Sequence, residues 1–301
     1  MAGSRRKRAL RQYSALIPIR ENQIDRLKTL FAGIHHTAAR IFSEGWQNGQ
    51  AQAWVSRGST PELCGAVGVV FRDDYVVCFA NFDGELLTEE IIQSLDDLLV
   101  DLISQRGERP LFYNVRGDME PVIALLRQRC FREDTFGYEL KCCDAPGSPT
   151  EGAGLTIRGF EPQHFDTYVR LLDGAFNPLM ARTGHHGDPF SREGETFRKR
   201  LRNSSDWGDF ASFWVADQLV GLYTLSDDVI DILAVHPQFQ NLGYGTAMTE
   251  HALRRILCEG GFPAAYLFVV AANEEARRLY LRLGFEVSGF YSENTYVGIN
   301  C

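Results

Sequence analysis

The sequence of 301 residues lacks the features of several specialised protein classes. It has no apolar run of about 18 residues, the length that a membrane-spanning helix needs, so we expect no membrane partner. Basic residues are outnumbered: 31 lysines and arginines against 39 acidic residues give a net charge of −8, which disfavours nucleic acid as a partner. The basic N-terminal tail has no apolar core and does not look like a secretion signal.

Cysteine is sparse and scattered. The seven cysteines form no C-x-x-C pair and no cluster with histidine, so the sequence predicts no metal site. Their odd number and irregular spacing favour free thiols, as in a reducing cytoplasm. Apolar residues make up 45% of the chain and charged residues 23%, which are ordinary values for a globular protein. We therefore expect a cytoplasmic protein with a core of normal size.

Proline and glycine gather in one stretch between two halves of the chain. Residues 144–154 hold three glycines and two prolines without periodicity, and we interpret them as a linker. On either side, 1–143 and 155–301 show the same order of expected elements: helices, hairpin, helix, strand, helix and closing strands. We therefore predict an α/β (α+β) fold of two similar domains, each a mixed, mostly antiparallel sheet flanked by helices.

The most informative stretch runs from 229 to 246. Seven residues rich in Val and Ile, with one acid, predict a strand that His236-Pro237 ends. The segment Q-N-L-G-Y-G (240–245) follows, and then an amphipathic helix begins. A glycine loop between a strand and a helix is typical of a phosphate site, because its N–H groups turn inward at the positive end of the helix.

A second motif, N-E-E-A-R-R-L-Y-L-R-L-G-F, spans residues 273–285. Asn273 is a good N-cap, and the acids after it suit the first turn of a helix. The apolar residues recur at helical spacing, and Gly284 is placed to end the helix. Residues 264–270 before the motif predict a short buried strand.

The two motifs, in this order and spacing, resemble the GNAT superfamily of N-acetyltransferases. Q-x-x-G-x-G after Val-x-Pro is similar to that family's acyl-CoA loop, and N-x-x-A-x-x-L-Y-x-x-x-G-F to its next helix. The resemblance covers about 155–301 and implies a tandem-domain protein whose first half is a degenerate GNAT-like domain. It also implies acetyl-CoA as co-substrate, with direct attack by a primary amine of a small molecule in a ternary complex.

The resemblance also implies roles for single residues. The implied cofactor-binding residues are Leu233, Ala234, Val235, Gln240, Asn241, Leu242, Gly243, Tyr244, Gly245, Thr246, Asn273 and Ala276. Tyr280 matches the catalytic general acid that protonates the leaving thiolate, although spacing alone favours a core tyrosine. Asp231 is the candidate general base, because strand alternation places it on the face of Leu233 and Val235. The family often has a glutamate where Val229 stands, so a water relay is an alternative to a direct base.

Several alternatives stay open. The acceptor could be a peptide or protein amine, or the chain could be a non-catalytic acyl-CoA-binding regulator. A ligase-like aminoacyl transferase is a third reading, because paired GNAT-like halves also occur in mycothiol synthase and the peptidoglycan-bridge enzymes. We read 174–191 as a long irregular segment, which the resemblance implies borders the acceptor pocket; His185-His186 could contact substrate there, but a solvated loop is the favoured reading. Neither the acceptor nor a homodimer can be decided from the sequence.

Overall fold

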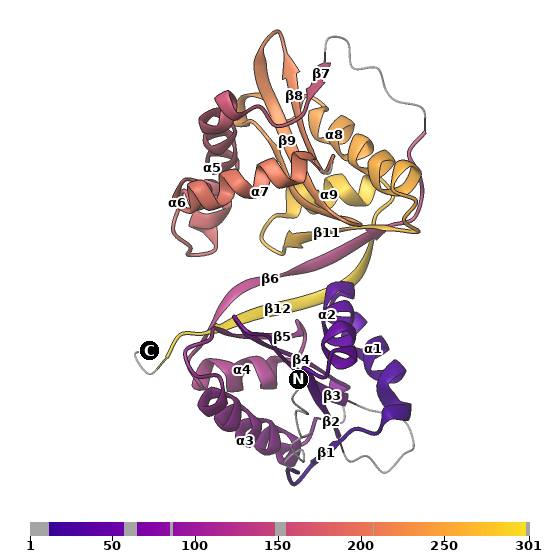
Figure 1. Cartoon of the computed structure of the whole chain (residues 1–301), viewed down its shortest axis with the longest axis vertical. Helices are drawn as coiled ribbons and strands as arrows, with labels where there is room; N and C mark the ends of the chain where they lie inside the picture. Colours follow the sequence, from indigo (N-terminus) through magenta and orange to yellow (C-terminus); the bar gives the residue numbers. More distant parts are fainter. Residues whose placement is uncertain (1–11, 57–64, 85–86, 148–154, 207, 299–301) are drawn as a thin grey trace, which may run out of the picture. The chain divides into compact units, whose positions relative to one another are not determined.

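The computed structural model describes residues 12–56, 65–84, 87–147, 155–206 and 208–298. The chain forms two compact units, Met1–Tyr138 with Ser288–Cys301 and Glu139–Val287 (Figure 1). The expected halves differ from these units at the C-terminus, because the last strand of the chain pairs within the first unit. Most of the predicted linker and of the basic N-terminal tail lies outside the described residues.

The first unit is a sheet covered by helices on both faces. Its strands follow the order β1-β2-β3-β4-β5-β12-β6. Their bounds are β1 (Leu16–Pro18), β2 (Ala51–Ser56), β3 (Gly65–Phe71), β4 (Val76–Phe82), β5 (Leu111–Arg116), β6 (Phe131–Cys142) and β12 (Glu286–Tyr296). The short η1 (Glu21–Gln23), α1 (Ile24–Ala32) and α2 (His36–Gln47) belong to the core on one face, and α3 (Glu89–Gln105) and α4 (Glu120–Gln128) to the core on the other.

The apolar residues over 21–43 recur at helical spacing, a pattern that predicts one helix, but this segment forms two helices, α1 and α2. Gly33 ends α1, and His35 then takes an extended conformation with φ of −165°. The Nδ1 atom of His35 accepts a hydrogen bond from the N–H of Ala38 at 3.0 Å, which caps α2. The apolar stripe continues through both helices, so periodicity alone did not reveal the break.

The second unit repeats this plan. Its strands follow the order β11-β10-β9-β8-β7, with β6 next to β11. Their bounds are β7 (Leu155–Arg158), β8 (Phe210–Val215), β9 (Gln218–Ser226), β10 (Val229–Val235) and β11 (Ala265–Val270). The helical elements are η3 (Pro162–His164), α5 (Phe165–Arg182), α6 (Pro189–Glu193), α7 (Glu195–Asp206), η4 (Pro237–Phe239), α8 (Tyr244–Leu253), the π-helical turn η5 (Arg254–Glu259) and α9 (Glu274–Arg282).

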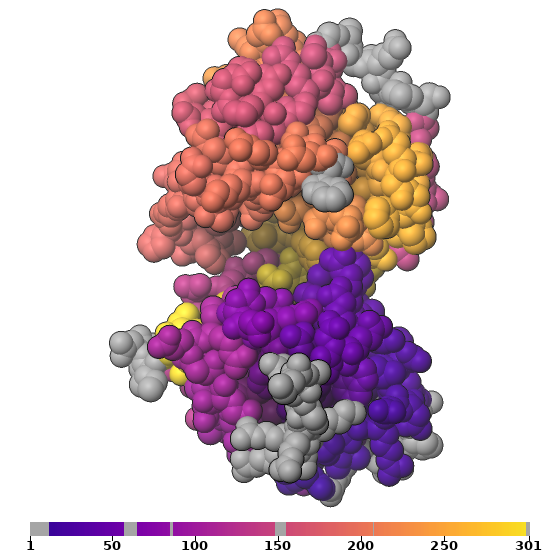
Figure 2. All heavy atoms as spheres, viewed as in Figure 1, coloured from indigo at the N-terminus to yellow at the C-terminus, as the bar shows by residue number. Residues whose placement is uncertain are grey.

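The core on one face of the second sheet lies beneath α5, α6 and α7. It joins Tyr168, Leu172 and Phe197 from these helices to Leu222 and Ile232 from the strands. Figure 1 shows α8 and α9 on the opposite side of β8 and β9. The atoms of α5 to α7, pink to coral in Figure 2, cover much of the visible face of this unit.

The structure corrects the sequence reading of 174–191. Residues 174–182 are not irregular: they continue α5 to Arg182, with Pro178 inside the helix. Polar bonds hold this end of α5 to the segment that follows. Both carboxylate oxygens of Asp173 accept from Phe190 and Ser191, and Asn177 exchanges two hydrogen bonds with Asp188. These hydrogen bonds join residues that are 11 to 18 positions apart in the sequence, and local helix propensity does not predict contacts over that separation.

The predicted fold class is confirmed: the part of the 12-stranded sheet that each unit contributes is mixed and mostly antiparallel, with helices on its faces. The β4–β5 and β10–β11 pairs are parallel. No helix in the described part of the chain is long and apolar enough to cross a membrane. The expectation of free thiols holds for Cys78, Cys142, Cys143 and Cys258, but Cys130 is disulfide-bonded, a pairing that sequence spacing could not reveal.

Candidate functional site

Strands β10 and β11 pair over only part of their length. Their parallel register joins Val229 to Tyr266 and Ile230 to Leu267. On its other side β10 stays paired with β9 as far as Val235. Because the N–H of His236 donates to Val220 of β9, alternation turns the N–H groups of Val235 and Leu233 toward the β11 side. That edge of β10 is therefore open to a ligand.

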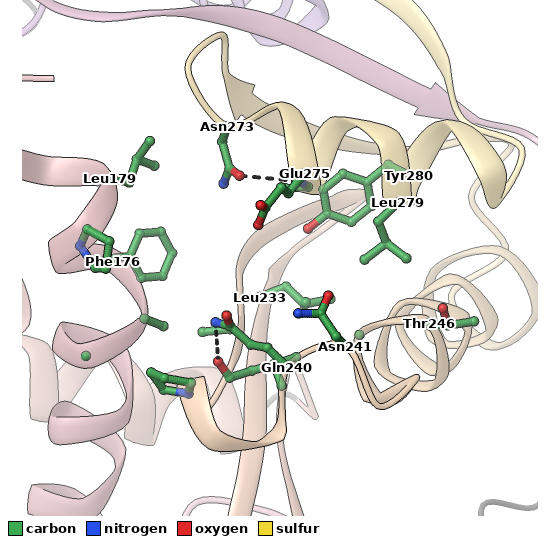
Figure 3. Close-up of a pocket in the computed structure, with 18 of the residues that line it drawn as sticks. Phe176, Leu179, Leu233, Gln240, Asn241, Thr246, Asn273, Glu275, Leu279 and Tyr280 are labelled. Carbon is green, nitrogen blue, oxygen red and sulfur yellow. Dashed lines mark hydrogen bonds between the residues drawn. The ribbon is translucent and has the colours of Figure 1, made fainter. Parts of the chain in front are cut away.

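A pocket with a volume of about 540 Å³ lies at this divergence (Figure 3). The end of β10, the loop after it, the first turn of α8, the helix α9 and the C-terminal half of α5 line it. It brings together most of the predicted cofactor-binding residues: Leu233, Ala234, Val235, Gln240, Asn241, Gly243, Gly245, Thr246, Asn273 and Ala276. Leu242 and Tyr244 do not line it; Leu242 is 64% exposed, and the Tyr244 ring packs against Phe239.

The glycine loop leaves the start of α8 without a side-chain cap. Gly243 is the N-cap residue, at a φ of 87° that favours glycine, and no side chain accepts from the first turn. A Cβ atom on Gly245 would stand 3.1 Å from Leu279 of α9, so this glycine permits the close approach of the two helices. Uncapped N–H groups at the positive end of a helix form an anion site.

Two polar side chains fix the borders of the pocket (Figure 3). Gln240 donates from Nε2 to the carbonyl oxygen of Val235 at 3.2 Å, which holds the loop to the end of β10. Asn273 accepts at Oδ1 from the N–H of Ala276 at 3.3 Å and so caps α9. The amide nitrogen of Asn273 still has donor capacity for a ligand.

Tyr280 reaches the pocket from α9. The side chain is 8% exposed, and its ring packs against Phe285 at 5.7 Å between centroids. Figure 3 shows its hydroxyl directed into the pocket. Burial raises the pKa of Tyr280 to about 12, so the phenol is protonated at neutral pH and can donate. The residue is thus both part of a packed interior and a pocket-lining acid.

Asp231 alternates with the buried Ile230 and Ile232, as Leu233 and Val235 do with Ala234, and the β9–β10 register shifts between Ile230 and Ile232. Its side chain is exposed and does not line the pocket. The histidines His185 and His186 do not line it either.

Sequence reasoning missed the contribution of α5. Phe176, Pro178 and Leu179 form one wall of the pocket. The signal was present, because Leu172, Phe176 and Leu179 continue the helical spacing beyond residue 174. The proline and the nearby glycines obscured it. Glu275 and Arg282 of α9 were also missed, since both look like ordinary solvent-facing residues.

Comparisons with known proteins agree with this geometry. The family model described as acetyltransferase (GNAT) domain matches residues 209–287. The mycothiol acetyltransferase of Actinosynnema mirum is 27% identical over 251 residues, which cover 76% of this chain and 80% of that protein. The mycothiol acetyltransferase of Streptomyces scabiei is 30% identical over 152 residues, or 46% of each chain.

Solved structures show the same fold over nearly the whole chain. A GCN5-related N-acetyltransferase from Sphaerobacter thermophilus aligns with a TM-score of 0.52 and 15% identity, covering 95% of this chain and 97% of the other. A Drosophila protein aligns with a TM-score of 0.55 and 16% identity, covering 95% and 99%. The matched domain over residues 209–287, the acetyltransferase relatives and the two similar units together support a tandem GNAT N-acetyltransferase.

Proposed function

We propose that the pocket of the second unit binds acetyl-CoA and that the enzyme transfers the acetyl group to a primary amine of a small molecule. One observation carries the proposal: an open strand edge at Leu233 and Val235 leads to the uncapped start of α8. This arrangement suits an extended amide-containing arm that ends in a pyrophosphate. Coenzyme A has both parts in that order.

The backbone supplies most of the proposed donor site. The N–H groups of Leu233 and Val235 bind the arm and, near the thioester, polarise its carbonyl. The N–H groups around Gly243, Gly245 and Thr246 bind the pyrophosphate. Binding therefore does not require a basic surface, which agrees with the net charge of −8.

Tyr280 and Asp231 are the proposed acid and base for direct attack in a ternary complex. The high pKa of Tyr280 keeps the proton available, but it makes full transfer to an ordinary thiolate unfavourable. Tyr280 therefore stabilises the departing sulfur by a hydrogen bond and gives up its proton when the thiolate is made basic by a dry pocket. Asp231 lies outside the pocket, so the proton of the amine would reach it through water.

The acceptor is proposed from the relatives. Their name, mycothiol acetyltransferase, supports a small-molecule acceptor in this chain as well. The pocket offers a carboxylate, Glu275, and two guanidinium groups, Arg182 and Arg282. A pocket lined by both a carboxylate and guanidinium groups suits a small polar acceptor.

The direct test is a transfer assay with acetyl-CoA and a panel of amines that includes sugars, amino acids, polyamines and a peptide. We expect an acetylated small molecule, detected by mass spectrometry, in an amount that matches the CoA released. The Gly243→Glu variant serves as the control with a blocked loop. Binding of acetyl-CoA without product from any amine would favour the regulator, and product from the peptide alone would favour a protein acceptor.

A further inference from the structure

A buried hydrogen bond joins helix α8 to strand β9. Tyr223 of β9 is fully buried, and its hydroxyl lies 2.7 Å from Nδ1 of His251 on α8. The ring of Phe213 on β8 packs against both partners, at 5.8 and 5.5 Å between centroids. Burial raises the pKa of Tyr223 and lowers the pKa of His251, so both groups are uncharged at neutral pH. The pair is therefore a neutral polar contact inside an apolar interface.

The other contacts of α8 with the sheet define its rotation less closely. Apart from Thr249, the buried side chains of α8 are apolar: Met248, Ala252 and Leu253. The hydroxyl of Thr249 donates within the helix, to the carbonyl of Gly245 at 2.7 Å. Apolar contacts are non-directional, whereas a hydrogen bond requires a narrow range of distances and angles. The bond between Tyr223 and His251 therefore selects one orientation of α8 on the sheet.

Helix α8 lies on the part of the sheet that borders the open strand edge. Strand pairing places Tyr223 opposite Leu233, and Gly221 opposite Val235. Gly221 and Tyr223 are two positions apart, so both face α8. A Cβ atom on Gly221 would stand 2.6 Å from Sδ of Met248, which shows how closely the helix approaches this strand. The hydrogen bond and the open edge thus belong to the same segment of the fold.

The orientation of α8 decides where its first N–H groups point. No side chain caps this helix, which begins at Tyr244 after the N-cap residue Gly243. His251 follows Tyr244 by about two turns in a helix of only ten residues. So short a helix rotates as one body, and a rotation at His251 also moves the N–H groups of Gly245 and Thr246.

We propose that Tyr223 and His251 are positioning residues for the acyl donor: their hydrogen bond sets the rotation of α8 and so directs its first N–H groups toward the pyrophosphate. The inference rests on the proposed function, because it assumes that this pyrophosphate binds at the start of α8. Neither residue lines the pocket, so both act through the helix. Loss of the bond therefore weakens donor binding although no group that contacts the donor is removed.

The test removes the hydrogen bond from either side. Tyr223→Phe keeps the ring against Phe213, His251→Leu keeps an apolar side chain on α8, and a double variant combines the two. Calorimetry measures Kd for acetyl-CoA well below the melting temperature of each variant. We expect Kd to rise roughly three- to tenfold in each single variant, an effect of the size of one hydrogen bond. The double variant should stay within about twofold of the single variants, because all three lack the same bond.

A spectroscopic signature separates positioning from a general loss of stability. In phosphorus NMR of bound acetyl-CoA, the pyrophosphate resonances should shift in Tyr223→Phe relative to the unaltered chain. His251→Asn keeps a polar group near the position of Nδ1, so it should restore both the affinity and the resonances. A merely structural role would lower the melting temperature and leave the resonances of the bound donor where they are.

Tyr168→Phe is the matched control. Tyr168 is also fully buried, and its hydroxyl accepts from the N–H of Glu161 at 3.4 Å, but it belongs to the core beneath α5. This variant should lower the melting temperature and leave Kd for acetyl-CoA unchanged. Unchanged Kd and resonances in folded Tyr223→Phe, or equal weakening in Tyr168→Phe, would overturn the inference. Failure of the unaltered chain to bind acetyl-CoA would instead overturn the proposed function.

Discussion

At the scale of single residues, Tyr280 carries the most direct chemical prediction. Replacement of Tyr280 by Phe removes the hydroxyl and keeps the ring packed against Phe285. We expect kcat to fall roughly tenfold or more, while the KM for acetyl-CoA changes little. Steady-state and single-turnover kinetics measure both. An unaltered kcat, with chemistry shown to limit the rate, would leave Tyr280 as a core residue only.

The pKa of Tyr280 also predicts a pH profile. An acid is effective while it is protonated, and with a pKa of about 12 this phenol stays protonated across the range in which the protein can be assayed. The profile of kcat/KM should therefore show no descending limb that belongs to Tyr280 below about pH 11. A limb near pH 9 that disappears in Tyr280→Phe would contradict the assignment of a raised pKa.

Glu293 gives a prediction about stability in the first unit. Burial, together with the charge of Asp134, raises the pKa of Glu293 to about 7, and a hydrogen bond from Thr135 opposes the shift. The folded state thus binds a proton more tightly than the unfolded state, so Glu293 lowers stability as pH rises from about 4 to 7. Glu293→Gln should raise the free energy of unfolding at pH 8, by up to about 3 kcal/mol, and change it little at pH 4.

Denaturant unfolding at the two pH values measures the effect of Glu293→Gln. The control is Glu286→Gln, an exposed position on the same strand. A gain in stability that is equal at both pH values would assign the effect to packing and reject the titration of Glu293.

At the scale of elements, the loop before α8 is the feature to test. Gly243 and Gly284 both have left-handed backbones, with φ of 87° and 86°, and a Cβ atom at either would meet nothing within 4 Å. Glutamate at either position should therefore strain the backbone to a similar extent. Only Gly243→Glu places a carboxylate in the anion site, so it alone should weaken acetyl-CoA binding, by roughly a hundredfold or more. Equal affinities of the two variants in calorimetry would remove the loop from the site.

The elements also show what the sequence could predict. β10 has the bounds that its Val and Ile content predicts, and Asn273 caps α9 as expected, because both depend on local residues. The bulge at Asp231 and the continuation of α5 past Pro178 depend on partners far along the chain. The sequence thus predicted which motif residues come together at the pocket, and it missed the wall of α5 that faces them.

At the scale of the whole molecule, the two units differ where the pocket forms. In the first unit β4 and β5 stay paired from Val76–Leu111 through Ala80–Val115, so no equivalent edge opens among the described residues of these two strands. The N–H of Phe82, at the end of β4, donates to Sδ of Met119 at 3.4 Å. Met119 is the residue that aligns with Asn273 when the two halves are compared. At the end of β4, where an acyl donor would bind in this unit, the N–H of Phe82 therefore already has a partner within the protein.

The placement of β12 shows why the sequence could not predict the units. Its residues Tyr291 to Thr295 pair with β5 of the first unit, although they follow the catalytic motifs directly. Strand pairing depends on both partners, and the repeat of element order suggested a simple division of the chain. The order of the elements along the chain indicated that the two halves are similar, but it did not indicate that β12 pairs with β5.

The stoichiometry of acetyl-CoA binding tests the central claim most directly. Calorimetric titration of the full chain should give one acetyl-CoA per chain, because the second unit has an open strand edge and an uncapped α8, and the paired β4 and β5 close the corresponding edge. The Gly243→Glu variant should abolish that single site while the protein stays folded. Two equivalent sites per chain, or one site that Gly243→Glu leaves intact, would contradict the account.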